Sequence, residues 1–189
     1  PLDQPDHARR ACLTALAMIR ELRRLQNKWK AEGRPVFDIG IGINSGEMVV
    51  GNMGSAMRFD YTVMGDMVNL GSRLEGANKE YGTNIIISEF TYNHVKDTIC
   101  CREIDSVRVK GKTRPVRIFE LLGEKKDEPG YQNLIKVFAT GLTLYRDGKW
   151  DDAIAAFQDA CKIKHDDFVS TTYIERCKTL KQHPPAHPW

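Results

Sequence analysis

The sequence lacks a strong net charge, and it also lacks long apolar runs. Its 28 Lys and Arg residues nearly balance 25 Asp and Glu residues, which leaves a net charge of +3. Because so small a charge creates only a weak overall field, any bound anion has to be held by local groups, and we expect no nucleic-acid partner. No apolar run approaches the roughly 20 residues that span a bilayer. We therefore expect no membrane contact by this chain.

The cysteines lack the spacing of a structural metal site or a disulfide framework. The five cysteines are Cys12, Cys100, Cys101, Cys161 and Cys177. No pair has CxxC spacing, so the pattern suits neither a zinc ribbon nor a disulfide framework, and reduced thiols in the cytoplasm are expected. The chain starts at Pro1 with no methionine and no signal-peptide pattern. We therefore expect a piece of a longer protein. Whether its upstream region carries a membrane anchor, and which signal regulates it, cannot be read from this sequence.

The remaining composition is that of a folded protein, with 41% hydrophobic and 28% charged residues in 189. Apolar residues first recur at steps of four and three between residues 7 and 31, which predicts a long amphipathic helix ended by Gly33 and Pro35. The predicted apolar stripe consists of Ala11, Ala15, Met18, Leu22, Leu25 and Trp29.

Residues 36–51 combine two strand-like runs, "VFDIGIGI" and "EMVVG", with the turn sequence "NSG" between them. This pattern predicts a β-hairpin with its turn at Asn44 to Gly46. The glycines do not form a phosphate-binding loop, because neither GxGxxG nor GxxxxGK[ST] is present and a strand rather than a helix follows. A further short strand, "RFDYTVMG", comes next.

A second helix is predicted from Asp66, which we expect to cap it, to Gly82, which should stop it. Its apolar stripe is Met67, Leu70, Leu74, Ala77 and Tyr81. After it come a buried strand "NIIIS", a short helix "EFTYNHV", and two strands, "REIDSVRVKG" and "RPVRIFELLG". This mixture predicts an α/β (α+β) fold with a largely antiparallel sheet.

The composition changes after Gly123. We expect a first domain over residues 1–123, a charged linker over 124–130, a small all-helical extension over 131–181 that resembles a tetratricopeptide helical hairpin, and a disordered tail over 182–189.

Two polar groups stand out in the second helix. Asn69 and Arg73 are four residues apart, so they project from the same helix face, which is not the apolar stripe. Spacing alone favours a solvated helix surface, and the alternative is a pair of donors aimed at a sugar oxygen and a phosphate. The cluster Arg108, Lys110, Lys112, Arg114 and Arg117 leaves a similar choice between a charged edge hairpin and a polyphosphate site.

A longer stretch resolves this choice by resemblance. The segment "INSGEMVVGNMGSAMRFDYTVMGDMVNLGSRLEGANKEYGTNIIIS", with "VKGKTRPVRIFEL" further on, closely resembles the catalytic domain of bacterial-type class III adenylate and guanylate cyclases. The likeness runs from about Pro5 to Leu122. It implies a ferredoxin-like domain that forms a head-to-tail homodimer, with ATP, or alternatively GTP, bound in the interface.

The resemblance also implies individual roles. Thr62 would meet the purine, Asn69 would hold the ribose, Arg73 would stabilise the transition state at the α-phosphate, and Lys110 would contact the terminal phosphates. Thr62 leaves the choice of nucleotide open, because a hydroxyl can accept from the adenine amino group or donate to the guanine carbonyl.

The family's two divalent cations, Mg²⁺ or Mn²⁺, are held by aspartates in the first half of its domain, which also holds a purine-reading lysine. Asp38, Asp60 and Asp66 do not occupy matching positions. The chain thus resembles the C-terminal portion of an N-terminally truncated cyclase domain, and we expect it to bind no metal and to be inactive alone. Three interpretations remain: a purine nucleotide cyclase, expected to make cyclic AMP with a guanylate cyclase as the alternative; a degenerate domain that only binds nucleotide or dimerises; and an interaction module.

Overall fold

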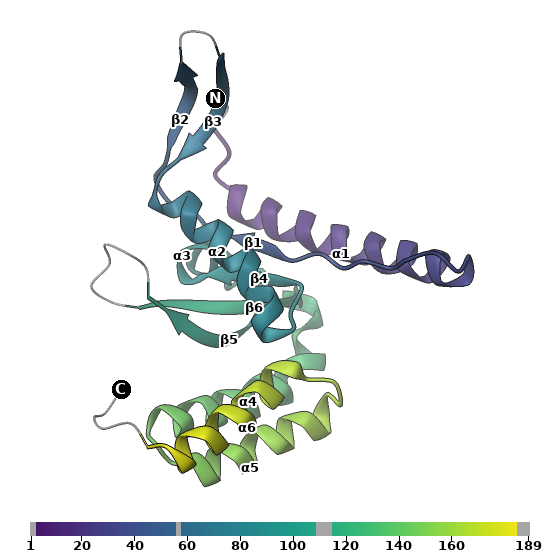
Figure 1. Cartoon of the computed structure of the whole chain (residues 1–189), viewed down its shortest axis with the longest axis vertical. Helices are drawn as coiled ribbons and strands as arrows, with labels where there is room; N and C mark the ends of the chain where they lie inside the picture. The colour runs from purple at the N-terminus through teal and green to yellow at the C-terminus, as the bar shows by residue number, and fades with distance from the viewer. Residues whose placement is uncertain (1–2, 56–57, 109–114, 185–189) are drawn as a thin grey trace.

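Helices and strands alternate through most of the computed structural model, which describes residues 3–55, 58–108 and 115–184. In chain order the elements are α1 (His7–Ala31), β1 (Ile41–Ile43), β2 (Val49–Ser55), β3 (Arg58–Met64), α2 (Asp66–Tyr81), β4 (Ile85–Ser88), α3 (Glu89–Val95), β5 (Ile99–Val107), β6 (Val116–Glu124), the 3-10 turn η1 (Lys125–Asp127), α4 (Glu128–Arg146), α5 (Trp150–Ile163) and α6 (Phe168–Gln182) (Figure 1). The expected α+β class is confirmed.

Four strands form the central sheet in the order β1-β4-β6-β5. β1 runs parallel to β4, with Gly42 opposite Ile86, whereas the β4 to β6 and β6 to β5 pairs are antiparallel. The expectation of a largely antiparallel sheet is therefore confirmed. β1 and β5 are its two edge strands.

The hairpin expected over residues 36–51 is wrong. β1 pairs with β4 instead, and the hairpin is formed by β2 and β3, with Gly51 opposite Thr62. The "NSG" turn residues explain the difference, because their side chains bind other elements: Asn44 donates to the Met67 carbonyl oxygen at 2.8 Å, and the Ser45 hydroxyl lies 3.1 Å from that of Thr91. The β2–β3 hairpin projects away from the sheet (Figure 1).

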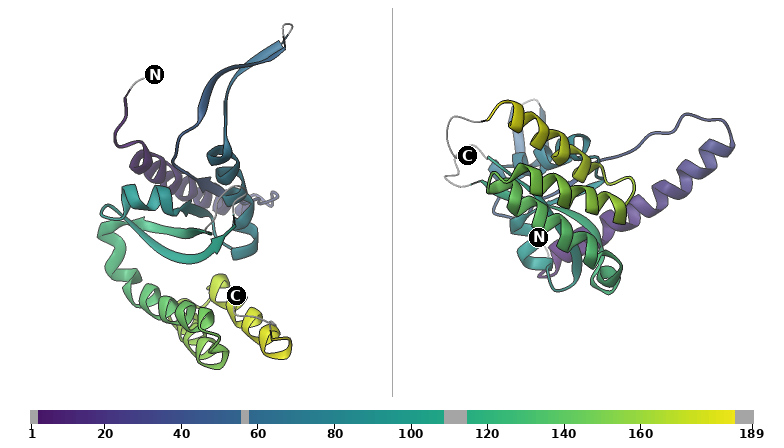
Figure 2. Two further views of the ribbon diagram at one scale, coloured as in Figure 1. Left: turned by 90° about the vertical axis from the view of Figure 1, so that its left-hand side faces the viewer. Right: turned by 90° about the horizontal axis from the view of Figure 1, so that it is seen from below.

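Two apolar clusters cover opposite faces of the sheet. Ile85 and Ile87 of β4 point into a cluster with α1 and α3, whereas Ile86 between them points into a cluster with α2, α4, α5 and α6. This is the strict alternation of a strand that is buried on both faces. Figure 2 shows α1 and the helices α4 to α6 on opposite sides of the strands.

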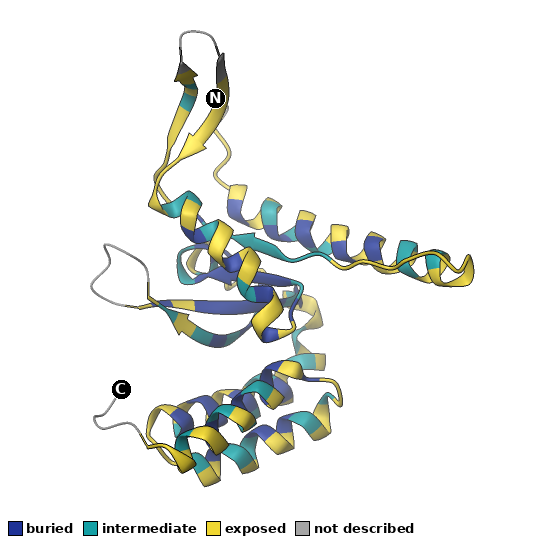
Figure 3. Ribbon diagram, in the orientation of Figure 1, coloured by how far each residue is buried: buried dark blue, intermediate teal, exposed yellow. Residues whose placement is uncertain are grey.

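Helix α1 has the predicted bounds, but its buried stripe differs from the prediction. Ala15 and Leu22 are buried as expected, while the other buried positions are Ala8, Cys12 and Ile19. Met18 is 49% exposed. The buried stripe thus runs through Ala8, Cys12, Ala15, Ile19 and Leu22, which leaves Met18 outside it. The C-terminal part of α1 extends beyond the sheet and is mostly exposed (Figure 3).

The C-terminal extension contains three helices, α4, α5 and α6, rather than the two of a hairpin, and α5 packs against both neighbours. Gly141 of α4 allows close contact with α5, because a Cβ there would lie 2.7 Å from Phe157 Cε1. The segment 124–130 is the end of β6, η1 and the start of α4. Residues 185–189 of the expected tail lie outside the described residues, and the tetratricopeptide resemblance stays a prediction.

A buried ionic cluster joins this extension to the sheet. Arg102 of β5 is 1% exposed and donates to the carboxylate of Glu120 on β6 and, at 2.7 and 2.8 Å, to both oxygens of Asp167 before α6. Burial by itself raises the pKa of Asp167, but hydrogen bonds from Arg102 and Ser170 and the charges of Arg102 and Lys164 outweigh it and hold the pKa at about 2. The extension is therefore part of the same core as the sheet.

Candidate active site

Helix α2 forms as the sequence predicts, with one correction at its start. Leu70, Leu74 and Tyr81 are buried, and Gly82 ends the helix in the left-handed conformation with φ 59°. The helix cap is Gly65, with φ 141°, rather than Asp66, which lies inside the first turn and makes no side-chain capping bond. A carboxylate there still lies at the positive end of the helix dipole.

A glycine in β1 determines how closely α2 lies on the sheet. A Cβ at Gly42 would be 2.3 Å from the Gly71 carbonyl oxygen and 2.4 Å from the Glu75 nitrogen, both backbone atoms of α2. Real Cβ atoms essentially never approach so closely. The glycine thus permits a contact between the helix backbone and the strand backbone, and this fixes the height of the helix above the sheet.

Two amides, one half-buried and one buried, then hold α2 along its length. At the first turn Asn44 donates to the Met67 carbonyl oxygen, while Ser88 donates to the Asn44 side-chain oxygen at 2.5 Å. Near the other end Asn78, 3% exposed, donates to the Ile41 carbonyl oxygen of β1 at 3.2 Å. The sequence analysis missed both. For Asn78 a signal was available, because it lies four residues after Leu74 and therefore beside the apolar stripe of the helix.

The predicted catalytic pair lies on the opposite face. Asn69 and Arg73 are exposed, one turn apart on α2. Neither side chain has a hydrogen-bond or ion-pair partner within residues 3–55, 58–108 and 115–184. A guanidinium with five N–H donors and an amide with donor and acceptor groups are therefore both available to a ligand on this face.

The other two predicted contacts are only partly placed. Thr62 is exposed on β3, which leads through Met64 and Gly65 directly into α2. The hairpin thus connects Thr62 to the helix that carries the catalytic pair. Lys110 lies outside the described residues, as do Lys112 and Arg114. Arg117 is engaged structurally, since it forms ion pairs of 3.2 and 3.6 Å with Glu89 and Glu103.

The described acidic residues do not fit the two divalent cations that the sequence resemblance implies. Asp38 accepts hydrogen bonds from Asn84 and from the Ile39 nitrogen, Asp60 lies on β3, and Asp66 opens α2. Across the part of the chain that the structure describes, no three His, Cys, Asp or Glu residues are grouped so that they could hold a metal ion.

The arrangement on α2 and β3 supplies hydrogen-bond donors and positive charge, and its described residues include no group of carboxylates that could hold a metal ion. Asn69 and Arg73 are suited to hold a sugar oxygen and to spread charge on a phosphate oxygen. Their work would be positioning and electrostatic stabilisation, which is how phosphoryl groups are generally handled by proteins.

Comparison with known proteins identifies the family of this domain. Residues 1–123 match the model of the adenylate and guanylate cyclase catalytic domain. The chain belongs to this family. Its cyclase domain therefore comprises α1, the sheet, the β2–β3 hairpin and the helices α2 and α3.

Individual cyclases agree with this assignment. Adenylate cyclase 1 of Rhizobium meliloti (strain 1021) is 38% identical over 123 residues, which are 65% of this chain and 18% of that protein. The terminal-differentiation specific adenylate cyclase of Dictyostelium discoideum is 36% identical over 160 residues, which cover 76% of this chain and 7% of that protein. The second match therefore reaches into the helical extension. This chain spans less than a fifth of either relative.

Solved structures show the same fold. The guanylyl cyclase Cya2 superposes with a TM-score of 0.57 at 36% identity, covering 67% of this chain and 63% of that one. The adenylyl cyclase CyaB from P. aeruginosa gives a TM-score of 0.51 at 39% identity, over 59% and 57% of the two chains. The ferredoxin-like cyclase fold expected from the sequence is thus confirmed. Among the helices that the structure describes, none has the length and apolarity to cross a membrane.

Proposed function

We propose that the complete protein converts ATP to cyclic AMP and pyrophosphate in signalling, and that this chain supplies the purine-, ribose- and phosphate-contacting half of the site. The observation that supports this is the division of α2 into two faces. Leu70 and Leu74 are buried against the sheet, while Asn69 and Arg73 lie on the outer face with no partner among the residues that the structure describes. Both polar groups are therefore free to contact a ligand while the backbone that carries them is fixed on the sheet.

In the proposed reaction the ribose 3′ oxygen attacks the α-phosphorus, the bond to the leaving pyrophosphate breaks, and the cyclic ester closes. Asn69 holds the ribose in line for this attack, and Arg73 stabilises the negative charge that builds up on the α-phosphate oxygens. Thr62 meets the purine and Lys110 the leaving group. We assign no step to a metal ion, because the described acidic residues do not fit one.

The domain is proposed to act as a head-to-tail homodimer in which the outer face of α2 meets nucleotide bound by the partner. The exposed apolar residues of the hairpin support a protein contact there, since Val49, Tyr61 and Met64 are 65%, 72% and 55% exposed. Val49 and Met64 are opposite each other in the hairpin register, and exposed apolar residues that lie together are typical of an interface.

Substitution of the catalytic pair in the complete protein tests the proposal. Arg73→Ala should lower the rate constant by on the order of 10² to 10³, as loss of a preorganised oxyanion donor does, and Asn69→Ala should act in the same direction. Lys79→Ala is the matched control, because Lys79 is an exposed cation on the same helix. Unchanged turnover in both folded variants would refute the assignment and leave a degenerate domain that binds nucleotide or only dimerises.

The similarity to the guanylyl cyclase Cya2 keeps GTP as the second candidate substrate. Assays with each triphosphate, in Mg²⁺ and in Mn²⁺, distinguish the two. The same assay on this chain alone should show no turnover, because none of its aspartates occupies a metal-binding position of the family. Activity that copurifies with the chain would refute that expectation.

A further inference from the structure

Helix α6 of the extension contacts the C-terminal end of the helix that carries the candidate catalytic pair. Arg176 Nη2 donates to Glu80 Oε1 at 2.5 Å and to the Tyr81 hydroxyl oxygen at 3.3 Å. Glu80 and Tyr81 form the last turn of α2. A single side chain of the extension thus binds two consecutive residues of α2.

A third element completes this contact. The Tyr81 hydroxyl donates to Asp105 Oδ2 on β5 at 2.5 Å, and Arg176 Nη1 donates to the same oxygen at 2.7 Å. The guanidinium also lies over the Tyr81 ring, 5.2 Å from its centroid. Because the group joins α2, β5 and α6 and is partly buried, it differs from an isolated surface ion pair, which stabilises little.

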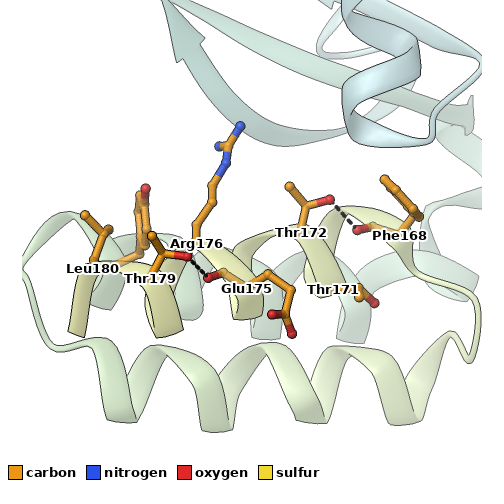
Figure 4. Close-up of a pocket in the computed structure, with 8 residues that line it drawn as sticks. Phe168, Thr171, Thr172, Glu175, Arg176, Thr179 and Leu180 are labelled. Atoms are coloured by element: carbon orange, nitrogen blue, oxygen red, sulfur yellow. Dashed lines mark hydrogen bonds between the residues drawn. The ribbon is translucent and has the colours of Figure 1, made fainter. Parts of the chain in front are cut away.

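The same helix also touches the residue that ends α2. A Cβ on Gly82 would lie 2.6 Å from the ring of Phe168, the first residue of α6. Figure 4 shows Arg176 extending from α6 towards the strands and helix above it, at the side of a groove of about 710 Å³ on α6. Tyr173, one turn before Arg176, donates to the Ile104 carbonyl oxygen of β5 at 2.7 Å. Helix α6 is therefore itself fixed on the sheet.

We propose that Arg176 is a positioning residue for the cyclase reaction, which couples the helical extension to Asn69 and Arg73 through α2. This inference rests on the proposed function of that pair. A helix moves nearly as a rigid rod, and Arg73 lies eight residues, or about 12 Å, from Tyr81. α2 is also held at Asn44, Gly42 and Asn78, so loss of the Arg176 contact shifts the helix against these contacts without detaching it, and even a small shift of the pair lowers turnover.

Turnover by the complete protein provides the first test. Arg176→Ala should lower kcat about tenfold or more while the KM for the triphosphate stays within about twofold, because misplacement of the reacting groups affects the transition state more than binding. Arg176→Lys keeps the positive charge but loses the planar guanidinium with its paired N–H donors. Its kcat should lie between those of the parent and of Arg176→Ala. Lys178→Ala is the control, since this exposed cation of α6 pairs only with Glu175 within its own helix, across the described residues, and it should leave kcat unchanged.

Hydrogen exchange provides a readout that does not depend on activity. Glu80→Gln weakens the contact from the α2 side and leaves the core of α6 intact, which guards against a folding defect in Arg176→Ala. In both variants of this chain, amides of the last turns of α2 should exchange faster, whereas those of α4 and α5 should not change. Parental exchange in α2, or parental kcat in folded Arg176→Ala, would overturn the proposal. Failure of the functional proposal itself would be recognised separately, because turnover would then be unchanged in the Asn69 and Arg73 variants.

Discussion

Substitution of Gly42 by alanine should move α2 away from the sheet. The new Cβ would lie 2.3 Å from the Gly71 carbonyl oxygen, whereas ordinary contacts begin near 3.4 Å. Both groups belong to the backbone, so no side-chain rotation relieves the clash, and the helix has to retreat by about 1 Å. The hydrogen bond of 3.2 Å from Asn78 to the Ile41 carbonyl oxygen would then be stretched.

The expected loss of stability follows from this displacement. Overpacking costs about 1–3 kcal/mol, and we expect a value near the upper limit because the stretched Asn78 bond adds to it. Denaturant unfolding of this chain, followed by circular dichroism, measures the difference. Gly76→Ala is the matched control: it lies in the middle of α2 with open space around its Cβ, so alanine should stabilise the chain by about 0.5–1 kcal/mol.

A second readout connects this backbone contact to the site. In the complete protein a 1 Å displacement of Asn69 and Arg73 should lower turnover about 10²-fold. An ordinary surface substitution changes the free energy of unfolding by no more than about 0.5 kcal/mol. If the free energy of unfolding of Gly42→Ala differs from that of the parent by no more than this, and turnover is normal, the close approach does not fix the helix and the reasoning fails.

Two other features give measurable predictions. Asp167→Asn should cost on the order of 3 kcal/mol at pH 7, because it removes one partner of a buried ion pair. The folded pKa of Asp167 is lowered to about 2, while an unfolded aspartate titrates near 3.9, so the parent should keep this stability above about pH 4 and lose it towards pH 2; an equally steep acid transition in the variant would contradict this. Tyr61→Lys, at an exposed position of the β2–β3 hairpin, should shift the dimer of the complete protein towards monomer in light scattering, and an unchanged mass would exclude the hairpin from the interface.

Local sequence signals determined the helices of the cyclase domain well. The bounds of α1, and the stop of α2 at Gly82, follow from periodicity and from glycine and proline, which act within a few residues. The bounds of the short helix α3 were also predicted correctly. The same spacing rule put Asn69 and Arg73 on one face of α2, away from its apolar stripe, as observed. Their catalytic roles, like that of Lys110, came from the family resemblance and stay predictions.

Pairing between distant segments could not be read from the sequence. "VFDIGIGI" and "EMVVG" carry strand character, but nothing in them specifies that β1 pairs with β4, more than forty residues later. Local turn chemistry therefore favoured the wrong hairpin. In the same way, the apolar residues of α1 indicated a buried stripe, while the actual stripe, with Ala8 and Cys12 in it, depended on how the helix lies against the sheet.

The tertiary structure alone decided what holds the site in place. In the sequence Gly42 is an ordinary strand glycine, and only the structure shows the α2 backbone packed against it. Likewise, Arg102 looks like an exposed strand cation in the sequence, whereas in the structure it pairs with Asp167, 65 residues later. Burial decides how much such residues affect stability. An exposed charge or an exposed glycine changes the free energy of folding little, whereas the same residue in a packed interior changes it strongly. The sequence determined which faces are apolar, and only the fold determined what each face meets.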